Sequence, residues 1–231
     1  GANSFVTAIY SKYLDWNISS FSWNGVTTIA SDEADKGSSP GDTGGDKNLL
    51  DALDFNSTGG SFQDIWQGHY QAINRANQAL YYLPLLTNAN SDLKARLTGE
   101  AKFLRAFSYF ILVRSFGGVP IVDHVPVAGN DADRAMLLTR KTKEEVYSFI
   151  ESDLNAAIAA LPQKNAYPTS DIGRASKGAA NALLAKVHLY QKNWQKVIDN
   201  CNLVTGYSLT PNFADIYKVS GENNAESIFE I

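Results

Sequence analysis

The segment from residue 91 to residue 116 predicts a long helix that is apolar on nearly every side. Its interior reads FLRAFSYFILV from Phe103 to Val113, with Arg105 as the one charged residue in that run. Gly117 and Gly118 follow and end the helix. Because a helix without a polar face has to lie between other helices, this segment predicts a layered, mainly helical molecule.

Five further segments predict helices because their apolar residues recur three and four positions apart; they span residues 5–14, 61–80, 143–161, 177–190 and 194–204. Only Gln191, Lys192 and Asn193 separate the last two, so these helices must be antiparallel. Alanines on the first of them allow the pair to approach closely. A helix, a short turn and a helix form the tetratricopeptide (TPR) unit. We therefore predict an all-α fold of TPR-like antiparallel helix pairs, with long loops, little strand and no fixed repeat length.

Two segments lack helical periodicity. Residues 31–60 contain six aspartates and six glycines and predict a long polar loop, of a length that is usually functional or disordered. Residues 120–139 predict an extended connection. Ser61 and Asp64 predict a capping pair at the start of the helix that follows the first loop.

Composition excludes several classes of function. The chain has 231 residues, 20 Lys+Arg against 24 Asp+Glu and a formal net charge of −4, and its cations are scattered, so we expect no nucleic-acid partner. No apolar run reaches the roughly 18 residues that a transmembrane helix needs. A single cysteine, Cys201, excludes an internal disulfide or a zinc cluster of cysteines. Helical spacing predicts that Cys201, Trp194 and Trp66 lie in the core.

The sequence offers little for catalysis or metal binding. Its histidines are far apart and have no metal-type spacing; they are His69, His124 and His188. Asp46 stands where a phosphate loop needs glycine, and Ala34 and Lys36 exclude an EF-hand, although an irregular calcium site stays open. A glycosidase-like pair of carboxylates also stays open, because their separation is a property of the fold. We predict no cofactor and no metal site.

Charges inside the apolar helix need partners, because an unpaired buried charge is costly. Arg105 is therefore predicted to form a structural ion pair, and Asp153 on the next helix is the expected partner. Glu100 and Arg114 are expected to be structural for the same reason.

Aromatic residues before the first long loop are candidates for ligand binding. Trp16, Phe21 and Trp23 do not fit a helical stripe. Sugar rings present apolar faces edged by hydroxyls, so a carbohydrate site combines flat aromatic platforms with carboxylates and amides. The candidate glycan-binding residues are Trp16, Trp23, Asp42, Asp46 and Asn48. The alternative is that these aromatic residues pack down as a lid and bind nothing.

Several motifs, in order along the chain, resemble those of the SusD/RagB family of surface glycan-binding lipoproteins of Bacteroidetes. The strongest is GEAKFLRAFSYF at residues 99–110, continued by FGGVPI at 116–121. The others are the pattern from Trp66 to Asn77, EVY at 145–147, GRASKGAA at 173–180 and ESIFEI at 226–231.

This resemblance implies an N-terminal, TPR-like helical domain spanning residues 1–231, from a protein about twice as long. It also implies a function: capture of oligosaccharide or polysaccharide at the outer-membrane surface for a SusC-like TonB-dependent transporter, by binding and without enzymatic activity. Membrane association would come only from an N-terminal lipid anchor that lies outside this sequence. A protein of another class stays open, namely a TPR-like protein–protein interaction module that binds no sugar.

Overall fold

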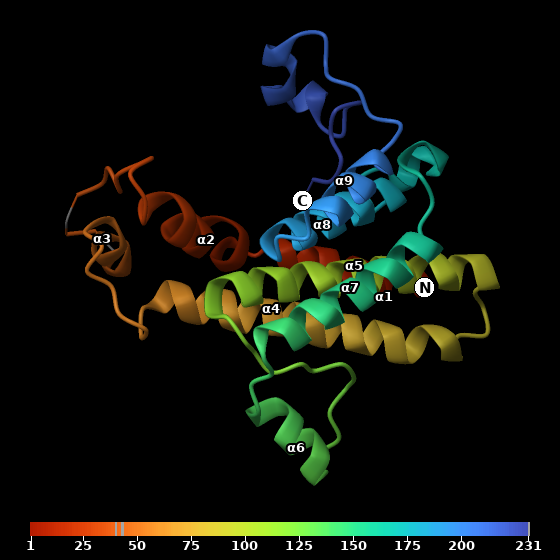
Figure 1. The fold of residues 1–231 in the computed structure, drawn as a ribbon, viewed down its shortest axis with the longest axis horizontal. Coiled ribbons are helices and arrows are strands. Elements are labelled where there is room, and N and C mark those ends of the chain that lie inside the picture. The colour runs from red at the N-terminus through yellow and green to blue at the C-terminus, as the bar shows by residue number, and fades with distance from the viewer. Residues whose placement is uncertain (40, 43, 231) are drawn as a thin grey trace.

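The computed structural model describes residues 1–39, 41–42 and 44–230, and these ranges contain helices and loops but no β-strand. The α-helices are α1 (Ala2–Tyr13), α2 (Ser22–Asn24), α3 (Gly45–Asp51), α4 (Gly60–Tyr82), α5 (Ser91–Phe116), α6 (Asp131–Leu138), α7 (Lys143–Ala160), α8 (Lys177–Tyr190) and α9 (Trp194–Asn202) (Figure 1). Two π-helical turns, Asn17–Phe21 and Gly25–Ile29, flank α2. The all-α prediction is confirmed.

The long helices are layered in chain order. α5 packs between α4 and α7, α7 packs on α8, and α8 packs on α9, while α1 lies against α4 and α5 (Figure 1). The segment predicted to be apolar on every side is therefore the central helix. Packing of each helix on the next one along the chain is the TPR-like arrangement that the sequence predicts.

Capping residues explain why the ends of the long helices match the predicted ends. The side chain of Asn90 accepts a hydrogen bond from the Leu93 amide (2.9 Å) at the start of α5. Thr142 and Glu145 form a capping box at the start of α7, with bonds of 3.1 and 2.7 Å. At the other end of α5, Gly117 has φ +71°, a conformation that favours glycine.

Arg105 and Asp153 form the ion pair that the sequence predicts. Arg105 is only 5% exposed, and its Nε and Nη2 donate to the two carboxylate oxygens of Asp153 at 2.7 and 2.9 Å. Its Nη1 donates to Asn77 Oδ1 (2.6 Å) and to the carbonyl of Asp123 (2.8 Å). Since Asn77 lies on α4, this one side chain joins α4, α5, α7 and the connection after α5.

Two regions predicted to lack helices contain one each. α3 lies within residues 31–60, where Leu50 is buried and anchors it. α6 lies within residues 120–139 and is capped by Asn130, whose Oδ1 accepts from the amides of Ala132 (2.9 Å) and Asp133 (3.2 Å). Both helices are too short for apolar periodicity to reveal them, so the loop predictions are wrong at these places.

The predicted Ser61–Asp64 capping pair is also wrong. Gly59 is the N-cap of α4, and the carboxylate of Asp46 accepts a hydrogen bond from the Ser61 amide at 3.0 Å. Asp64 instead accepts from the Ser22 hydroxyl at 2.7 Å. A side chain from a different helix therefore replaces the local cap.

The prediction that Trp194 and Cys201 lie in the core is wrong. Trp194 is 59% exposed and Cys201 is exposed, because α9 packs on α8 alone among the long helices of the described chain. Trp66 is partly buried and packs against the core with its inner edge. Helical spacing identified an apolar face of α9 correctly but could not show whether that face is covered.

The histidines occupy separate environments. His69 is buried beside Ser108, His124 lies between Asp123 and Asp133, and His188 is buried on α8. Within residues 1–39, 41–42 and 44–230, no group of three metal-ligating side chains comes together. None of the helices in those ranges combines the length and apolar character needed to cross a bilayer.

Candidate functional site

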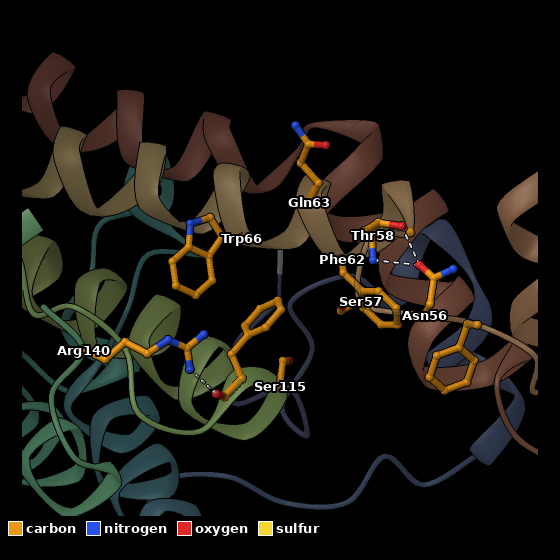
Figure 2. A pocket seen from close by; sticks show the side chains of 11 residues that line it. Asn56, Ser57, Thr58, Phe62, Gln63, Trp66, Ser115 and Arg140 are labelled. Carbon is orange, nitrogen blue, oxygen red and sulfur yellow. Dashed lines mark hydrogen bonds between the residues drawn. The ribbon is translucent and has the colours of Figure 1, made fainter. Parts of the chain in front are cut away.

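An open cleft of about 870 Å³ lies where the start of α4 meets the end of α5 (Figure 2). Its aromatic walls are Phe55, Phe62, Trp66 and Phe116, and we call it the Trp66 cleft. The loop before α4 and Arg140, which lies between α6 and α7, complete it. Segments far apart in the sequence thus build one concave surface.

Ring contacts hold the aromatic walls in place. Trp66 meets Phe116 edge to face at 5.2 Å and Tyr70 at 5.0 Å, while Phe55 meets Phe62 at 5.6 Å. The Tyr70 hydroxyl donates to the Pro120 carbonyl at 2.7 Å, which ties this end of α4 to the chain beyond α5. Burial raises the pKa of Tyr70 far above its usual value, so its hydroxyl keeps its proton. These contacts fix the orientations of the aromatic rings that line the cleft.

Arg140 supplies the positive charge of the cleft. Its Nη1 donates to the carbonyls of Phe116 (3.2 Å) and Gly118 (2.9 Å), which satisfies carbonyls at the end of α5, and its guanidinium lies 5.7 Å from the Trp66 ring. No carboxylate in the described ranges pairs with it, and its Nε and Nη2 keep free donors. Figure 2 shows the side chain extending below Trp66 toward the body of the cleft.

Amide side chains lie along the opposite rim. Asn56 Oδ1 accepts from the amide (2.9 Å) and the hydroxyl (2.5 Å) of Thr58, which closes a tight turn. The Asn56 NH₂ group has no hydrogen-bond partner among the residues that the structure describes. Gln63 rises from α4 on the side away from Arg140 (Figure 2). The cleft therefore combines aromatic faces with free hydrogen-bonding groups.

The structure brings three of the five candidate residues near one another in a separate hollow of about 290 Å³. Trp16 and Asp42 line it, and Trp16 is 66% exposed. Lys36 Nζ donates both to Asp42 Oδ1 (2.6 Å) and to Asn48 Oδ1 (2.7 Å), so the three polar side chains form one cluster. The hydrogen bond from Lys36 lowers the pKa of Asp42 to about 2.

The other two candidates lie elsewhere. Trp23 is partly buried beside His69 and Tyr13, where the three residues line a small hollow of about 210 Å³. Asp46 caps α4 through Ser61 and pairs with Lys47 at 3.1 Å, so the protein itself uses its carboxylate. Contrary to the sequence interpretation, Phe21 and Trp23 lie on helical turns, with Ile18 and Ser22 buried on the inner side.

Sequence reasoning missed the Trp66 cleft because it assigned Trp66 to the core. The spacing of Phe62 and Trp66 on one helix face predicts a buried stripe, yet the stripe ends at the surface. The available signal was a polar, turn-rich segment at residues 56–60 directly before that stripe. The sequence alone could not show that Phe116 and Arg140 lie beside this segment, because only the folded chain brings them together.

A family model described as "Starch-binding associating with outer membrane" matches residues 28–189. This chain belongs to the SusD-like family. The family assignment agrees with the resemblance seen in the motifs, and the description of the family names starch binding and association with the outer membrane.

Individual SusD-like proteins show the same relationship. SusD-like protein P25 of Formosa agariphila is 30% identical over 174 residues, which cover 74% of this chain and 32% of that protein. Starch-binding protein SusD of Bacteroides thetaiotaomicron is 28% identical over 144 residues, or 59% of this chain and 24% of that protein. The present chain therefore matches about a third or less of the length of these curated relatives.

Solved SusD-like structures share the fold. A laminarin-binding SusD-like protein superimposes with a TM-score of 0.85 and 30% identity, over 99% of this chain and 50% of that one. A SusD-like protein of Bacteroides fragilis gives a TM-score of 0.79 with 27% identity, over 100% of this chain and 43% of that chain. The arrangement of the α-helices is thus that of SusD-like proteins.

Proposed function

We propose that this SusD-like chain binds oligosaccharide in the Trp66 cleft, and that the protein captures glycan at the outer-membrane surface for a SusC-like TonB-dependent transporter. The observation that carries the proposal is the cleft itself: four aromatic side chains face an open space of about 870 Å³ edged by free amide and guanidinium donors. Membership in a starch-binding family supports the same chemistry.

The cleft suits a sugar for a physical reason. The C–H faces of a pyranose ring pack on Trp66 or Phe55, and its hydroxyls exchange hydrogen bonds with the NH₂ of Asn56 and the free donors of Arg140. Because the site is open, the sugar hydroxyls that lose hydrogen bonds to water regain only some of them from the protein. We therefore expect weak to moderate affinity.

Laminarin is the first ligand to test, since one structural relative, 30% identical to this chain, is a laminarin-binding SusD-like protein. The aromatic walls do not by themselves select a sugar or a linkage. A panel that includes laminarin, starch and an unrelated polysaccharide keeps the measurement open to other glycans.

We propose binding without hydrolysis. A glycosidase places two carboxylates on either side of the scissile bond, and the described residues that line the Trp66 cleft include no Asp or Glu. Incubation of the chain with each polysaccharide should release no new reducing ends. Their appearance would contradict this part of the proposal.

The candidate residues taken from the sequence enter the proposal in different ways. We propose that Trp16 is a sugar platform. Asp42 and Asn48 shape the neighbouring hollow through Lys36, and Asp46 supports α4, so we assign these three an indirect role. Trp23 is assigned to packing.

Affinity electrophoresis in polysaccharide-containing gels tests the proposal. The wild-type chain should be retarded by at least one glycan, and Trp66→Ala and Phe55→Ala should migrate freely. Trp194→Ala is the matched control, because Trp194 is equally aromatic and lies on the distant helix α9. Wild-type migration that no glycan retards would favour the protein–protein interaction module instead.

The partnership with a transporter has its own test. A SusC-like transporter encoded beside the full-length gene should co-purify with the full-length protein from detergent-solubilised outer membranes. Absence of that complex would contradict the proposed role in transport but not the proposed glycan binding.

A further inference from the structure

A second hollow, of about 400 Å³, lies on the other side of α4 from the Trp66 cleft. Trp16, Asn17, Asp64, Gln67 and Gln71 line it, and we call it the Trp16 pocket. It differs from the Trp66 cleft in character, since one indole accompanies several polar side chains. The sugar binding proposed for the Trp66 cleft does not use these residues.

Trp16 offers an open aromatic face at this pocket. The indole is 66% exposed, and one of its faces stacks on Phe21 with ring centres 5.9 Å apart and planes inclined by 19°. Lys47 Nζ lies over the Phe21 ring, 4.0 Å from its centre. Phe21 therefore supports Trp16 as a flat platform whose second face remains available.

Free amides lie beside that platform. Asn17, Gln67 and Gln71 make no side-chain hydrogen bond to any part of the chain that the structure describes, and Gln67 and Gln71 are one helical turn apart on α4. Each amide carries two donors and an acceptor, the complement of neighbouring hydroxyls on a sugar ring. Asp64 is held by Ser22 through Oδ2 (2.7 Å), which leaves Oδ1 as a further acceptor.

A glycine determines the depth of the pocket. At Gly68 an added Cβ would lie 1.9 Å from Cγ2 of Ile18, so only glycine lets the turn at residues 17–21 lie directly on α4. Ile18 is buried in this contact, and Trp16 and Asn17 precede it. The close approach thus places the indole and the amides around one space.

The charges of the pocket favour a neutral ligand. Lys12 is paired with Asp15, and Asp64 adds a second carboxylate. An anionic sugar would meet two carboxylates and one neutralised cation, which is unfavourable at short range. A neutral hexose has no such penalty.

We propose that the Trp16 pocket is a second subsite for a neutral sugar residue, and that one oligosaccharide chain crosses α4 to contact both it and the Trp66 cleft. Gln63 lines the cleft and Gln67 lines the pocket, and these residues are neighbours at i and i+4 on the exposed edge of α4, which joins the two spaces. This inference rests on the proposed glycan binding. It adds that the chain recognises an oligosaccharide long enough to reach both spaces.

Calorimetric titration with laminarihexaose and laminaribiose tests the second subsite. The variants are Trp16→Ala and the double variant Gln67→Ala/Gln71→Ala, which replaces exposed helix residues by a better helix former. Trp194→Ala is the control, since Trp194 is 59% exposed and far from either space. Circular dichroism verifies that each variant is folded.

We expect Trp16→Ala to weaken hexaose binding roughly 3- to 10-fold, the range that aromatic contacts contribute. The double variant should also weaken hexaose binding. Laminaribiose is too short to span α4, so it should bind the wild type and both variants with the same affinity. Hexaose affinity at the wild-type level in both variants overturns the subsite; if Trp66→Ala still loses binding, the proposed function stands. If the wild type binds neither laminarihexaose nor an oligosaccharide of any other glycan in the panel, both proposals are overturned.

Discussion

At the residue scale, the ion pair between Arg105 and Asp153 determines how three helices and one connection meet. The sequence predicts this pair because an arginine in an apolar helix needs a buried partner. It does not reveal Asn77, whose side chain comes from another helix, or the Asp123 carbonyl, because backbone acceptors leave no trace in a sequence. Trp194 is a different case. Its spacing identifies the apolar face of α9, but the sequence does not show that this face is exposed.

Replacing Asp153 by Ala should destabilise the chain strongly. Arg105 would remain buried without its carboxylate, and breaking a buried pair by removing one partner costs about 3–5 kcal/mol. Urea unfolding followed by circular dichroism measures the change. Asp215→Ala is the control, since its partner Lys218 is exposed and that pair should contribute less than about 1 kcal/mol. Equal effects of the two substitutions would contradict the role assigned to Arg105.

His69 should make the stability of the chain depend on pH. Burial lowers its pKa to about 3, and the positive charges of Arg114 and Lys12 act in the same direction. In the unfolded chain the histidine has a pKa near 6.5, so the unfolded state binds the extra proton first as the pH falls below that value. Stability is therefore lost between about pH 6.5 and pH 3.

The variant His69→Gln isolates this contribution. Glutamine keeps a hydrogen-bonding group near Ser108 but has no charge to gain. Between pH 7 and pH 5 the wild type should lose about 2 kcal/mol more than the variant, as measured by urea unfolding at each pH. Parallel pH profiles for the two proteins would show that His69 does not carry the effect.

At the scale of single elements, helix length and capping decided what could be predicted. α5 and α8 begin where the sequence indicates, because each has a capping side chain at its start and a long apolar pattern after it. α3 and α6 have seven and eight residues, too few to show a period. Asn130, a strong N-cap residue, was the available signal for α6.

Gly68→Ala should disturb the contact between α4 and the turn at residues 17–21. The new methyl group has no space beside Ile18, and overpacking of this kind costs about 1–3 kcal/mol. Because the turn must move, hexaose affinity should fall as it does in Trp16→Ala. Thermal unfolding and calorimetry measure the two effects.

Gly60→Ala is the matched control on the same helix. There an added Cβ meets only an oxygen of Asp46, at 3.9 Å, so no atom has to move. Stability and affinity should stay near the wild-type values. A loss equal to that in Gly68→Ala would mean that any side chain at a glycine of α4 is harmful, whatever its distance from Ile18.

At the scale of the whole molecule, the layered packing of the helices places Trp66 on α4 and Phe116 on α5 beside the loop residues that complete the Trp66 cleft. The fold class could be predicted from long periodic segments, and the family could be predicted from several motifs that follow one another along the chain. The Trp66 cleft could not, because residues 55–66, Phe116 and Arg140 come together only after α4, α5 and α7 have packed.

The central claim is that sugar rings contact Trp66 and Trp16. A ¹H–¹⁵N titration of the four tryptophan indole groups with laminarihexaose tests it directly, because each indole reports its own surroundings. The account predicts that the Trp66 and Trp16 signals shift with one saturation curve while Trp194 does not move. A saturable change confined to Trp23 and Trp194, or no change in any signal, would contradict it.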